Sequence, residues 1–515
     1  MSKRRAPAAS PKPGRLLNGA ASDTGRAAFV ELRQQTARET EAARQTTITM
    51  LKAVASDPET HLFADRIDAL TDTARCLGGR PRSHSTWALV VFGASISIFG
   101  SAAAAARNLQ DRELWHIVVT AAGPLLAADA SDAVRGPQRH HWDYFLSRRV
   151  GPHVAGMVEA FAEGAARRSR EVGLADPGTA SFSRLDRPHC VSMDGKVFTS
   201  PIGTREAELV DKQTGEIRKI RRDPSVGQHH EGGDENNVVW GTKFALAATR
   251  SPFAGHRVIL GVRQVADDGR GEAGAFVDLA LDIAARLPGV VAFITDGALR
   301  GNAINQIQQT TGTLHVAIPR RGAKTRGGVK IGDNHYASRG LPASRSRDKQ
   351  FANCGGHDLW AAGGTISERI VTNDGTIHWQ LATRVGRTRH RAGPKRWNIL
   401  AKYRLVCAAT GTTHEWHEPL TALLADKHTD FLRAEYLRGV AADDPDFDRV
   451  YGMRSDAESL NAQLEHAFHK QRIPALGGNN KTMVLLFAAL AQNSWAREVW
   501  HREVARQTNA PPHAA

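Results

Sequence analysis

Residues 290–301 have the sequence VVAFITDGALRG, an apolar and β-branched run that ends on Asp296. A short run of this kind, bounded by Pro and Gly, is typical of a buried strand. A helical pattern precedes it at 273–287, and a second helical pattern at 302–309 leads to another apolar strand at 313–319. This part of the chain is therefore expected to alternate helices with the strands of one sheet.

Three further strands are expected upstream. The first is 189–198 (HCVSMDGKVF), which carries Asp194 in its middle, and a polar stretch separates it from 238–249 and 256–265. A turn at 252–255 makes the last two neighbours in a meander. The resulting order, β-β-β-α-β-α-β, resembles that of the RNase H core. The expected fold class is therefore α/β with an RNase-H-like core.

The regions around this core differ in pattern. Helical spacing of apolar residues predicts an all-α N-terminal domain, and a hairpin signal at Asn373-Asp374-Gly375 lies in a basic, strand-rich region. The expected domains are a disordered basic arm at 1–23, a helical domain at 24–175, the first part of the core at 186–319, a basic β-rich insertion at 320–419 and a C-terminal helical part of the core at 420–505. The arm has no apolar h-region, so no signal peptide is expected.

Short helices are expected within the helical domain at 85–99, 101–109 and 111–120. Their spacing is compatible with a helix-turn-helix at 80–120 that would place one helix in a major groove of DNA. A plain helical bundle explains the same pattern equally well.

Two features bear on the compartment. Residues 88–106 carry no formal charge and approach membrane-spanning length. Small and polar interruptions favour two packed helices broken near Gly100 over a spanning helix, so no membrane partner is expected. The cysteines, Cys76, Cys190, Cys354 and Cys407, lie far apart and do not indicate a disulfide framework. We expect a cytoplasmic protein associated with the nucleoid.

One set of cysteine and histidine residues leaves two interpretations open. Cys354 and His357 are followed downstream by Cys407 and by His414 or His417. Cysteine and histidine are the side chains that hold structural zinc. However, Cys407 and the downstream histidine are not closely spaced in the sequence, and this favours packed or solvated side chains over a zinc site.

The net charge of +15 points to a polyanionic partner. Two stretches account for the excess. From 317 to 350 the basic residues are Arg320, Arg321, Lys324, Arg326, Lys330, Arg339, Arg345, Arg347 and Lys349, against Asp333 and Asp348; from 384 to 404 they are Arg384, Arg387, Arg389, Arg391, Lys395, Arg396, Lys402 and Arg404, with no acid. A surface that follows DNA phosphates, with Trp397 and Tyr403 among its cations, is favoured over a merely solvated face.

Asp194 and Asp296 are the first candidates for catalysis. In the expected topology the first and fourth strands are adjacent, so the two carboxylates would face each other. Such a pair repels unless a cation lies between them. Carboxylates of this kind bind Mg²⁺, for which Mn²⁺ could substitute. Each Asp is also followed by Gly, and Asp-Gly alone is a common turn dipeptide.

A third carboxylate is expected on a later helix. Residues 451–461 (YGMRSDAESLN) place Arg454, Glu458 and Asn461 on one polar stripe that continues to Glu465. Taken alone, such a stripe is usually a solvated face.

The spacing Tyr451-x2-Arg454-x3-Glu458 resembles the Tyr-Arg-Glu-Lys signature of DDE bacterial insertion-sequence transposases, and residues 295–301 resemble the second-Asp motif of that family. Asp194 then corresponds to the first Asp. The resemblance implies that Asp194, Asp296 and Glu458 are catalytic and bind two Mg²⁺ ions for in-line cleavage and strand transfer. It also implies double-stranded DNA as partner and a homodimer on two element ends.

The expected DNA-binding residues come from the signature and from the basic stretches. They are Tyr451, Arg454, Asn461, Lys470, Arg300, Arg320, Arg321, Arg389, Arg391, Lys395, Arg396 and Trp397. One departure is that Glu465 stands where the signature has Lys, a position associated with DNA backbone contact. Lys470 or Arg472 could serve instead.

Two alternatives to an active transposase remain. A catalytically silent, transposase-derived DNA-binding protein would explain Glu465. A nuclease with an RNase H fold would keep the carboxylates without joining strands. Inverted repeats flanking the coding sequence would favour a transposase.

Overall fold

The computed structural model describes residues 41–71, 83–123, 135–199, 208–210, 213–219, 223–230, 238–253, 255–319, 336–394, 396–469 and 472–509. The chain divides into two compact units, Met1–Met50 and Leu51–Ala515. In the first unit the described residues, 41–50, are helical. The remaining described elements lie in the second unit.

A mixed sheet forms the core of the second unit. Its strands are β1 (Cys190–Thr199), β4 (Gly227–His230), β5 (Val238–Arg250), β6 (Arg257–Gln264), β7 (Ala292–Ile294) and β8 (Leu314–Val316). β5 pairs antiparallel with β1, β4 and β6, whereas β1, β7 and β8 run parallel. α8 (Gly271–Arg286) precedes β7, and α9 (Gly301–Thr311) precedes β8. The expected order of strands and helices is therefore present, with β4 and the hairpin of β2 (Glu208–Val210) and β3 (Ile217–Lys219) added after β1.

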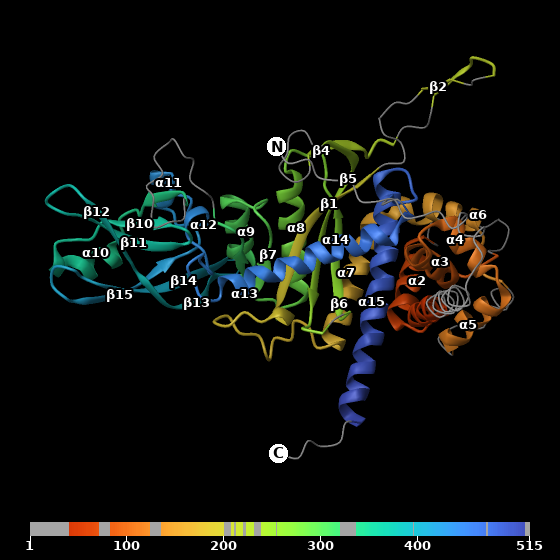
Figure 1. The fold of residues 1–515 in the computed structure, drawn as a ribbon, viewed down its shortest axis with the longest axis horizontal. Coiled ribbons are helices and arrows are strands. Elements are labelled where there is room, and N and C mark those ends of the chain that lie inside the picture. Colours follow the sequence, from red (N-terminus) through yellow and green to blue (C-terminus); the bar gives the residue numbers. More distant parts are fainter. Residues whose placement is uncertain are drawn as a thin grey trace, which may run out of the picture. The chain divides into compact units, whose positions relative to one another are not determined.

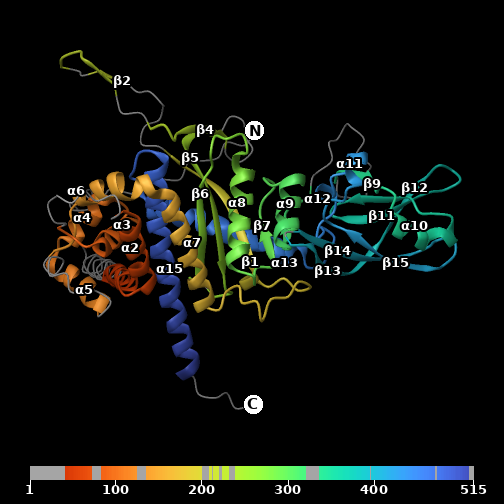
Figure 2. The same cartoon turned by 180° about the vertical axis from the view of Figure 1, so that it is seen from behind.

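The pleat of the sheet sends alternate side chains into two hydrophobic layers. Val191 and Met193 of β1 belong to the layer that α8 and α9 cover. Phe198 and Leu246 belong to the opposite layer, which contains residues of α14 (Ser455–Ala467) and α15 (Gly478–Asn509). Figure 1 shows α14 crossing one face of the sheet, and the reverse view in Figure 2 shows α8 and α9 on the other.

The helices that precede the sheet share its core. They are α2 (Pro58–Thr71), α3 (Thr86–Phe99), α4 (Ala102–Leu109), α5 (Arg112–Ala122), α6 (Arg139–Tyr144), the π-helix η4 (Phe145–Val150), the 3-10 turn η5 (Gly151–His153), α7 (Val154–Glu171) and the 3-10 turn η6 (Arg187–His189). α15 contacts α3, α7 and β6. A separate helical domain was expected at 24–175, but from Leu51 onward these helices belong to the same compact unit as the sheet.

The helices expected at 85–99, 101–109 and 111–120 are present as α3, α4 and α5, and Ser85, Ser101 and Asp111 cap their N-termini. The side chains of α3 from Thr86 to Ile96 are buried, so α3 does not offer a free face to a DNA groove. Among the described helices, none by itself has the length and apolar character needed to cross a membrane. α3 and α4 meet those criteria as a pair, but they bend by 116° at their junction.

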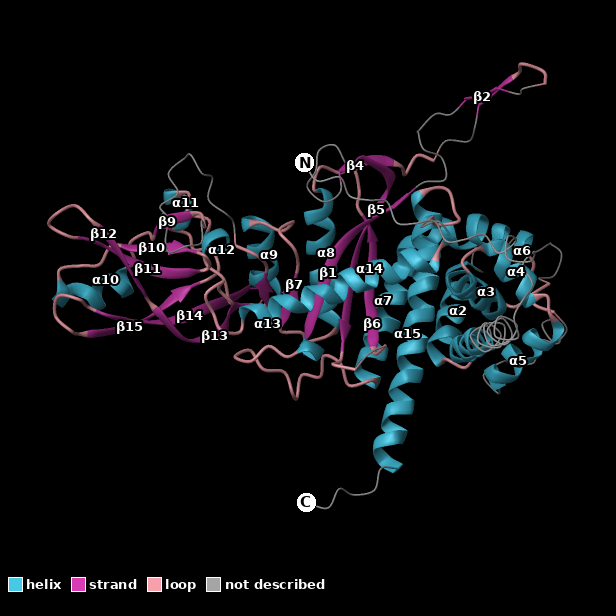
Figure 3. Cartoon of the chain, in the orientation of Figure 1, coloured by secondary structure: helices cyan, strands magenta, loops and turns pink. Residues whose placement is uncertain are grey.

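The described part of the β-rich insertion contains two sheets, seen as the strand-rich region of β9 to β15 in Figure 3. The first contains β9 (Ser338–Gly340), β10 (Leu359–Ala362), β11 (Thr365–Val371) and β12 (Ile377–Leu381); the second contains β13 (Thr383–Gly393), β14 (Arg396–Val406) and β15 (Thr413–Pro419). α10 (Arg345–Phe351) and the 3-10 turn η7 (Ala352–Cys354) lie between β9 and β10. The expected hairpin is formed by β11 and β12, and Gly375 in its turn has a φ of 81°.

Short helices return the chain from the insertion to the sheet. They are α11 (Asp426–Thr429), α12 (Arg433–Tyr436), α13 (Phe447–Tyr451) and the 3-10 turn η8 (Gly452–Arg454), which leads directly into α14. The hydroxyl of Ser192 in β1 donates to the carbonyl oxygen of Met453 at 2.9 Å. The start of α14 is therefore fixed to the strand that carries Asp194.

Candidate active site

Asp194 and Asp296 lie side by side because β1 and β7 are parallel neighbours. The pairing register sets Ser192 opposite Ile294, and two residues further along each chain come Asp194 and Asp296. The Asp296 carboxylate accepts a hydrogen bond from the Ala298 amide at 2.8 Å, which holds it in the turn after β7. The first and second predicted carboxylates are thus brought together.

The Asp194 carboxyl group is mostly removed from water. Its pKa rises to about 6, first because burial disfavours the charged form and then because the charge of Asp296 is nearby. The Gly195 amide and the Asn461 side-chain amide each donate to it at 2.9 Å. Two neighbouring carboxylates repel, and a cation bound between them would remove that repulsion.

An ionic cluster at Asp456 fixes α14 over the sheet. Arg187 Nη1 donates to both carboxylate oxygens of Asp456 at 2.7 and 2.8 Å, and Arg250 Nη1 lies 3.1 Å from one of them. Arg257 donates to Ser459 on the next part of the helix. Residues from η6, β5 and β6 therefore set the position of the helix that carries the third predicted carboxylate. This cluster was not anticipated, since its members are distant in sequence.

Glu458 and Asn461 lie about one turn apart on α14, but their environments differ. Asn461 is buried and donates to Asp194. The Glu458 side chain is 51% exposed and accepts a hydrogen bond from Arg454 Nη2 at 2.6 Å. Asn461, which was expected to contact DNA, thus has its amide committed to a carboxylate inside the site.

The surroundings of Tyr451 show that the three carboxylates share one neighbourhood. Burial raises the pKa of its hydroxyl, Arg454 opposes that rise, and the charges of Asp296, Glu458 and Asp194 add to it. The Tyr451 ring stacks on Phe447, and the Arg454 guanidinium lies 5.8 Å from its centroid. Tyr451 and Arg454 therefore lie near these carboxylates.

Glu465 forms an ion pair with Lys196 of β1. Lys196 lies two residues after Asp194, so the pleat sets both on the same face of the sheet. The strand that carries Asp194 therefore also places a cation beside Glu465. Lys196 was missed in the sequence, although strand alternation from Asp194 could have identified it.

Gly195 allows a fourth carboxylate, that of Glu272 in α8, to approach β1 from the face of the sheet opposite α14. A Cβ atom at this position would lie 1.6 Å from Glu272 Oε1, so no larger residue fits without a shift. Glu272 Oε2 pairs with Lys243 Nζ at 2.7 Å, and its charge contributes to the raised pKa of Asp194 after burial and Asp296. Glu272 was not predicted as a site residue.

The second basic stretch makes many contacts within the protein. Arg384 and Arg387 donate to the carbonyl oxygen of Gly439, and Arg389 donates to that of Gly312 at 2.8 Å. These arginines join β13 to neighbouring segments, so some of their N–H donors are already used within the protein while each guanidinium keeps its charge.

Trp397 is likewise used in packing. A Cβ atom added to Gly312 would lie 2.6 Å from its ring, and the guanidinium groups of Arg389 and Arg391 lie 5.3 and 4.9 Å from the ring centroid. Arg391 and Arg396 are exposed, and Arg300 is 51% exposed. Of the other predicted DNA-binding residues, Arg320, Arg321, Lys395 and Lys470 lie outside the described residues.

The donor set at the carboxylates fits a hard divalent ion such as Mg²⁺. The raised pKa of Asp194 is what burial and an adjacent negative charge produce. Asn461 Oδ1, beside Asp194, is buried and finds no hydrogen-bond partner among the described residues. Arg454 pairs with Oε1 of Glu458, and the second oxygen of that carboxylate would be the one to reach a bound ion.

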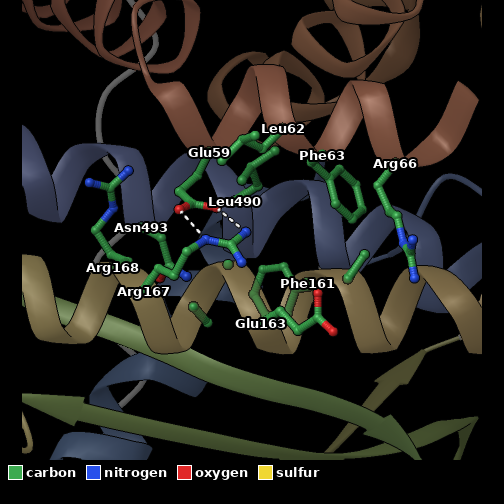
Figure 4. Close-up of a pocket in the computed structure, with 13 residues that line it drawn as sticks. Glu59, Leu62, Phe63, Arg66, Phe161, Glu163, Arg167, Arg168, Leu490 and Asn493 are labelled. Atoms are coloured by element: carbon green, nitrogen blue, oxygen red, sulfur yellow. Dashed lines mark hydrogen bonds and ion pairs between the residues drawn. The ribbon is translucent and has the colours of Figure 1, made fainter. Parts of the chain in front are cut away.

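A separate pocket of about 480 Å³ lies between α2, α7 and α15, away from these carboxylates. Figure 4 shows its lining, where Arg167 spans the opening to donate to Glu59 through two hydrogen bonds of 2.9 Å. Its other walls include Leu62, Phe63 and Phe161. This arrangement joins α2 to α7 and contains no predicted site residue.

Comparison with protein-family models and with curated proteins finds no match to this chain. Function is therefore inferred from the geometry of the site and from the motifs in the sequence.

Proposed function

We propose that the protein is a DNA transposase of the DDE type, with an RNase-H-like core in which Asp194, Asp296 and Glu458 bind Mg²⁺. The observation that carries the proposal is the position of Asp194 beside Asp296, on the sheet face that α14 covers with Glu458 and Asn461. The strand arrangement supports it, because β1, β5 and β6 are antiparallel while β7 and β8 run parallel to β1.

The reaction is phosphodiester hydrolysis followed by strand transfer at insertion-sequence ends. Asp194, Asp296 and Glu458 would hold Mg²⁺, or Mn²⁺ in its place, and the bound ions would supply an activated water and charge stabilisation for the leaving 3′ oxygen. The residues of the chain hold and orient the site. Asn461 fixes one oxygen of Asp194, and Arg454 stands beside Glu458 as a cation for a DNA phosphate.

Double-stranded DNA is the proposed partner, with a homodimer assembled on two element ends and with association to the nucleoid. The exposed cations Arg300, Arg391 and Arg396 are the described residues best suited to phosphate contact. Lys196 takes the place of the signature Lys near the active site.

Two other functions share most of these features. A silent DNA-binding protein is favoured by Glu465, and a nuclease with the same fold would need only the carboxylates. The pairing of Glu465 with Lys196 weakens the first alternative, since the local charge is balanced.

The test is cleavage of a supercoiled plasmid that carries the native DNA flanking the coding sequence. Wild type is compared with Asp296→Asn and Glu458→Gln, with Asp448→Asn as a matched control because Asp448 is an exposed acid on α13. We expect Mg²⁺-dependent cutting at the element boundary in wild type and in the control, and a loss of at least about 100-fold in the two active-site variants.

The outcomes separate the three functions. Binding without cutting in Mg²⁺ or Mn²⁺ would establish the silent protein. Cutting that ignores the element boundary, with no joined product, would establish the nuclease. Equal cutting by all variants would show that these carboxylates take no part in DNA cleavage.

A further inference from the structure

Four potential metal ligands converge in the insertion, far from the carboxylates in sequence. They are Cys354, His357, Cys407 and His414, and one ligand atom from each lies within 4.8 Å of all the others. Cys354 Sγ is 2.9 Å from His414 Nε2. Cys354 ends η7 and His357 lies in the connection to β10 of the first sheet, whereas Cys407 follows β14 and His414 lies in β15 of the second sheet.

His357 is oriented as a metal ligand. Its Nδ1 lies 2.5 Å from Glu368 Oε1, a contact in which the imidazole donates to the carboxylate. Its side chain is only 2% exposed, and its Nε2 is buried without a hydrogen-bond partner among the described residues. Metal-bound histidines commonly donate their second ring nitrogen to a carboxylate in this way.

The two cysteines are also held in place. Between Cys354 and His357, Gly355 and Gly356 have φ values of 76° and 96°, which turn the chain sharply enough for both side chains to point at one place. Cys407 lies at the start of the turn after β14, where its amide donates to the carbonyl oxygen of Thr412 and its carbonyl oxygen accepts from the Gly411 amide, each at 2.8 Å.

Phe351 lies against one side of the cluster. It packs edge-on against His357 at 4.8 Å, His414 at 5.0 Å and Trp416 at 5.3 Å between centroids. Its ring therefore shields the two histidines, whereas Cys354 is partly exposed. His417, the other histidine considered from the sequence, is exposed and lies outside the cluster.

We propose that Cys354, His357, Cys407 and His414 bind one structural Zn²⁺ that joins the two sheets of the insertion. Two thiolates and two imidazoles form a closed tetrahedral zinc set, in which neighbouring ligand atoms are about 3.3–3.8 Å apart. Small side-chain movements suffice to reach that spacing. Binding releases the thiol protons to solvent, and the soft thiolate ligands separate this site from the all-oxygen carboxylate site.

The test is the zinc content of the full-length protein, purified under reducing conditions and dialysed against metal-free buffer. We expect about one Zn²⁺ per chain, and replacement by Co²⁺ should give the thiolate charge-transfer absorption of a tetrahedral site. His414→Ala and Cys354→Ser should reduce the bound zinc at least about 10-fold, while Glu368→Gln should weaken binding by about 10- to 100-fold.

His417→Ala is the matched control, since it removes an exposed histidine from the same strand, and it should retain full zinc. Asp296→Asn should also retain zinc, which keeps this result independent of the proposed DNA chemistry. The proposal is overturned if wild type contains no zinc and takes up neither Zn²⁺ nor Co²⁺, if His414→Ala keeps its zinc, or if the protein purified in this way holds a Cys354–Cys407 disulfide.

Discussion

Asp194 has a buried carboxyl group beside a negative charge, and the resulting shift of its pKa makes the stability of the protein depend on pH. Because its folded pKa of about 6 lies above the ordinary 3.8, the folded protein binds the proton more tightly than the unfolded chain does. The stabilisation from this proton is present below about pH 4 and is lost as the pH rises through about 6.

Asp194→Asn should therefore stabilise the metal-free protein at neutral pH. At about pH 7.5 we expect the free energy of unfolding to increase by about 1–3 kcal/mol, with little difference near pH 4. Urea unfolding in EDTA at both pH values measures this difference in the free energy of unfolding. Addition of Mn²⁺ should stabilise wild type alone, so that wild type becomes the more stable of the two proteins. A difference that does not depend on pH would contradict the assigned environment of Asp194.

Lys196 and Glu465 offer a second prediction at this scale. Glu465→Lys sets two cations together and Lys196→Glu sets two anions together, so each should lower stability by about 0.5–1 kcal/mol. The double exchange should recover most of this loss. A double-mutant cycle measured by unfolding tests the pair, and strictly additive effects would show that the two side chains do not interact.

The nearness of Asp194 and Asp296 could be predicted because the element order resembles the RNase H core, in which the first and fourth strands are adjacent; Asp194 lies in β1 and Asp296 in the turn after β7. The pairing of Arg454 with Glu458 follows from i, i+4 spacing. The packing of Arg389 and Trp397 at Gly312 could not be predicted, because it depends on how the insertion meets α9.

At the level of elements, α14 is the part that brings the third carboxylate to the sheet. Asp456→Ala should leave Arg187 and Arg250 without their shared partner beside Arg257, so repulsion and unpaired buried charge should lower stability by about 2–3 kcal/mol. Asp448→Ala, an exposed acid on α13, is the control and should change stability by less than about 0.5 kcal/mol. Equal effects in both variants would mean that the Asp456 cluster does not anchor α14.

Helix boundaries were predictable where a local cap marks them. The expected helices at 101–109 and 111–120 begin within one residue of α4 and α5, because Ser101 and Asp111 accept hydrogen bonds from the first-turn amides. The position of α14 on the sheet was harder to predict from the sequence, since Arg187, Arg250 and Arg257, which contact it, come from segments about 200 residues or more away.

At the scale of the second unit, α15 connects the helices before the sheet with the sheet itself. Its Ser494 hydroxyl donates to Asp57 Oδ2 at 2.6 Å, and Arg168 of α7 pairs with the other oxygen of Asp57. Sequence patterns suggested two domains here. They share one core because a helix from the far end of the chain packs between them.

Asp57→Ala tests this connection. Because Asp57 and Arg168 are each 1% exposed, loss of the carboxylate leaves the buried Arg168 with Glu171 as its remaining ion-pair partner and should lower the free energy of unfolding by about 3 kcal/mol. Glu59→Gln, at the partly exposed pair with Arg167 in Figure 4, should cost about 1 kcal/mol or less. If the helices before the sheet unfold in a separate transition that Asp57→Ala does not affect, the shared core is not cooperative.

The proposed function depends above all on Asp194, Asp296 and Glu458 binding the same divalent ions. Mn²⁺ binding, followed by electron paramagnetic resonance with and without a duplex of the flanking DNA, measures this directly in zinc-saturated full-length protein. We expect Asp194→Asn, Asp296→Asn and Glu458→Gln each to weaken Mn²⁺ binding by about 10-fold or more, whereas Asp448→Asn, at an exposed acid on α13, should bind as wild type does. Unchanged Mn²⁺ binding in all three variants would show that these carboxylates do not form a metal site.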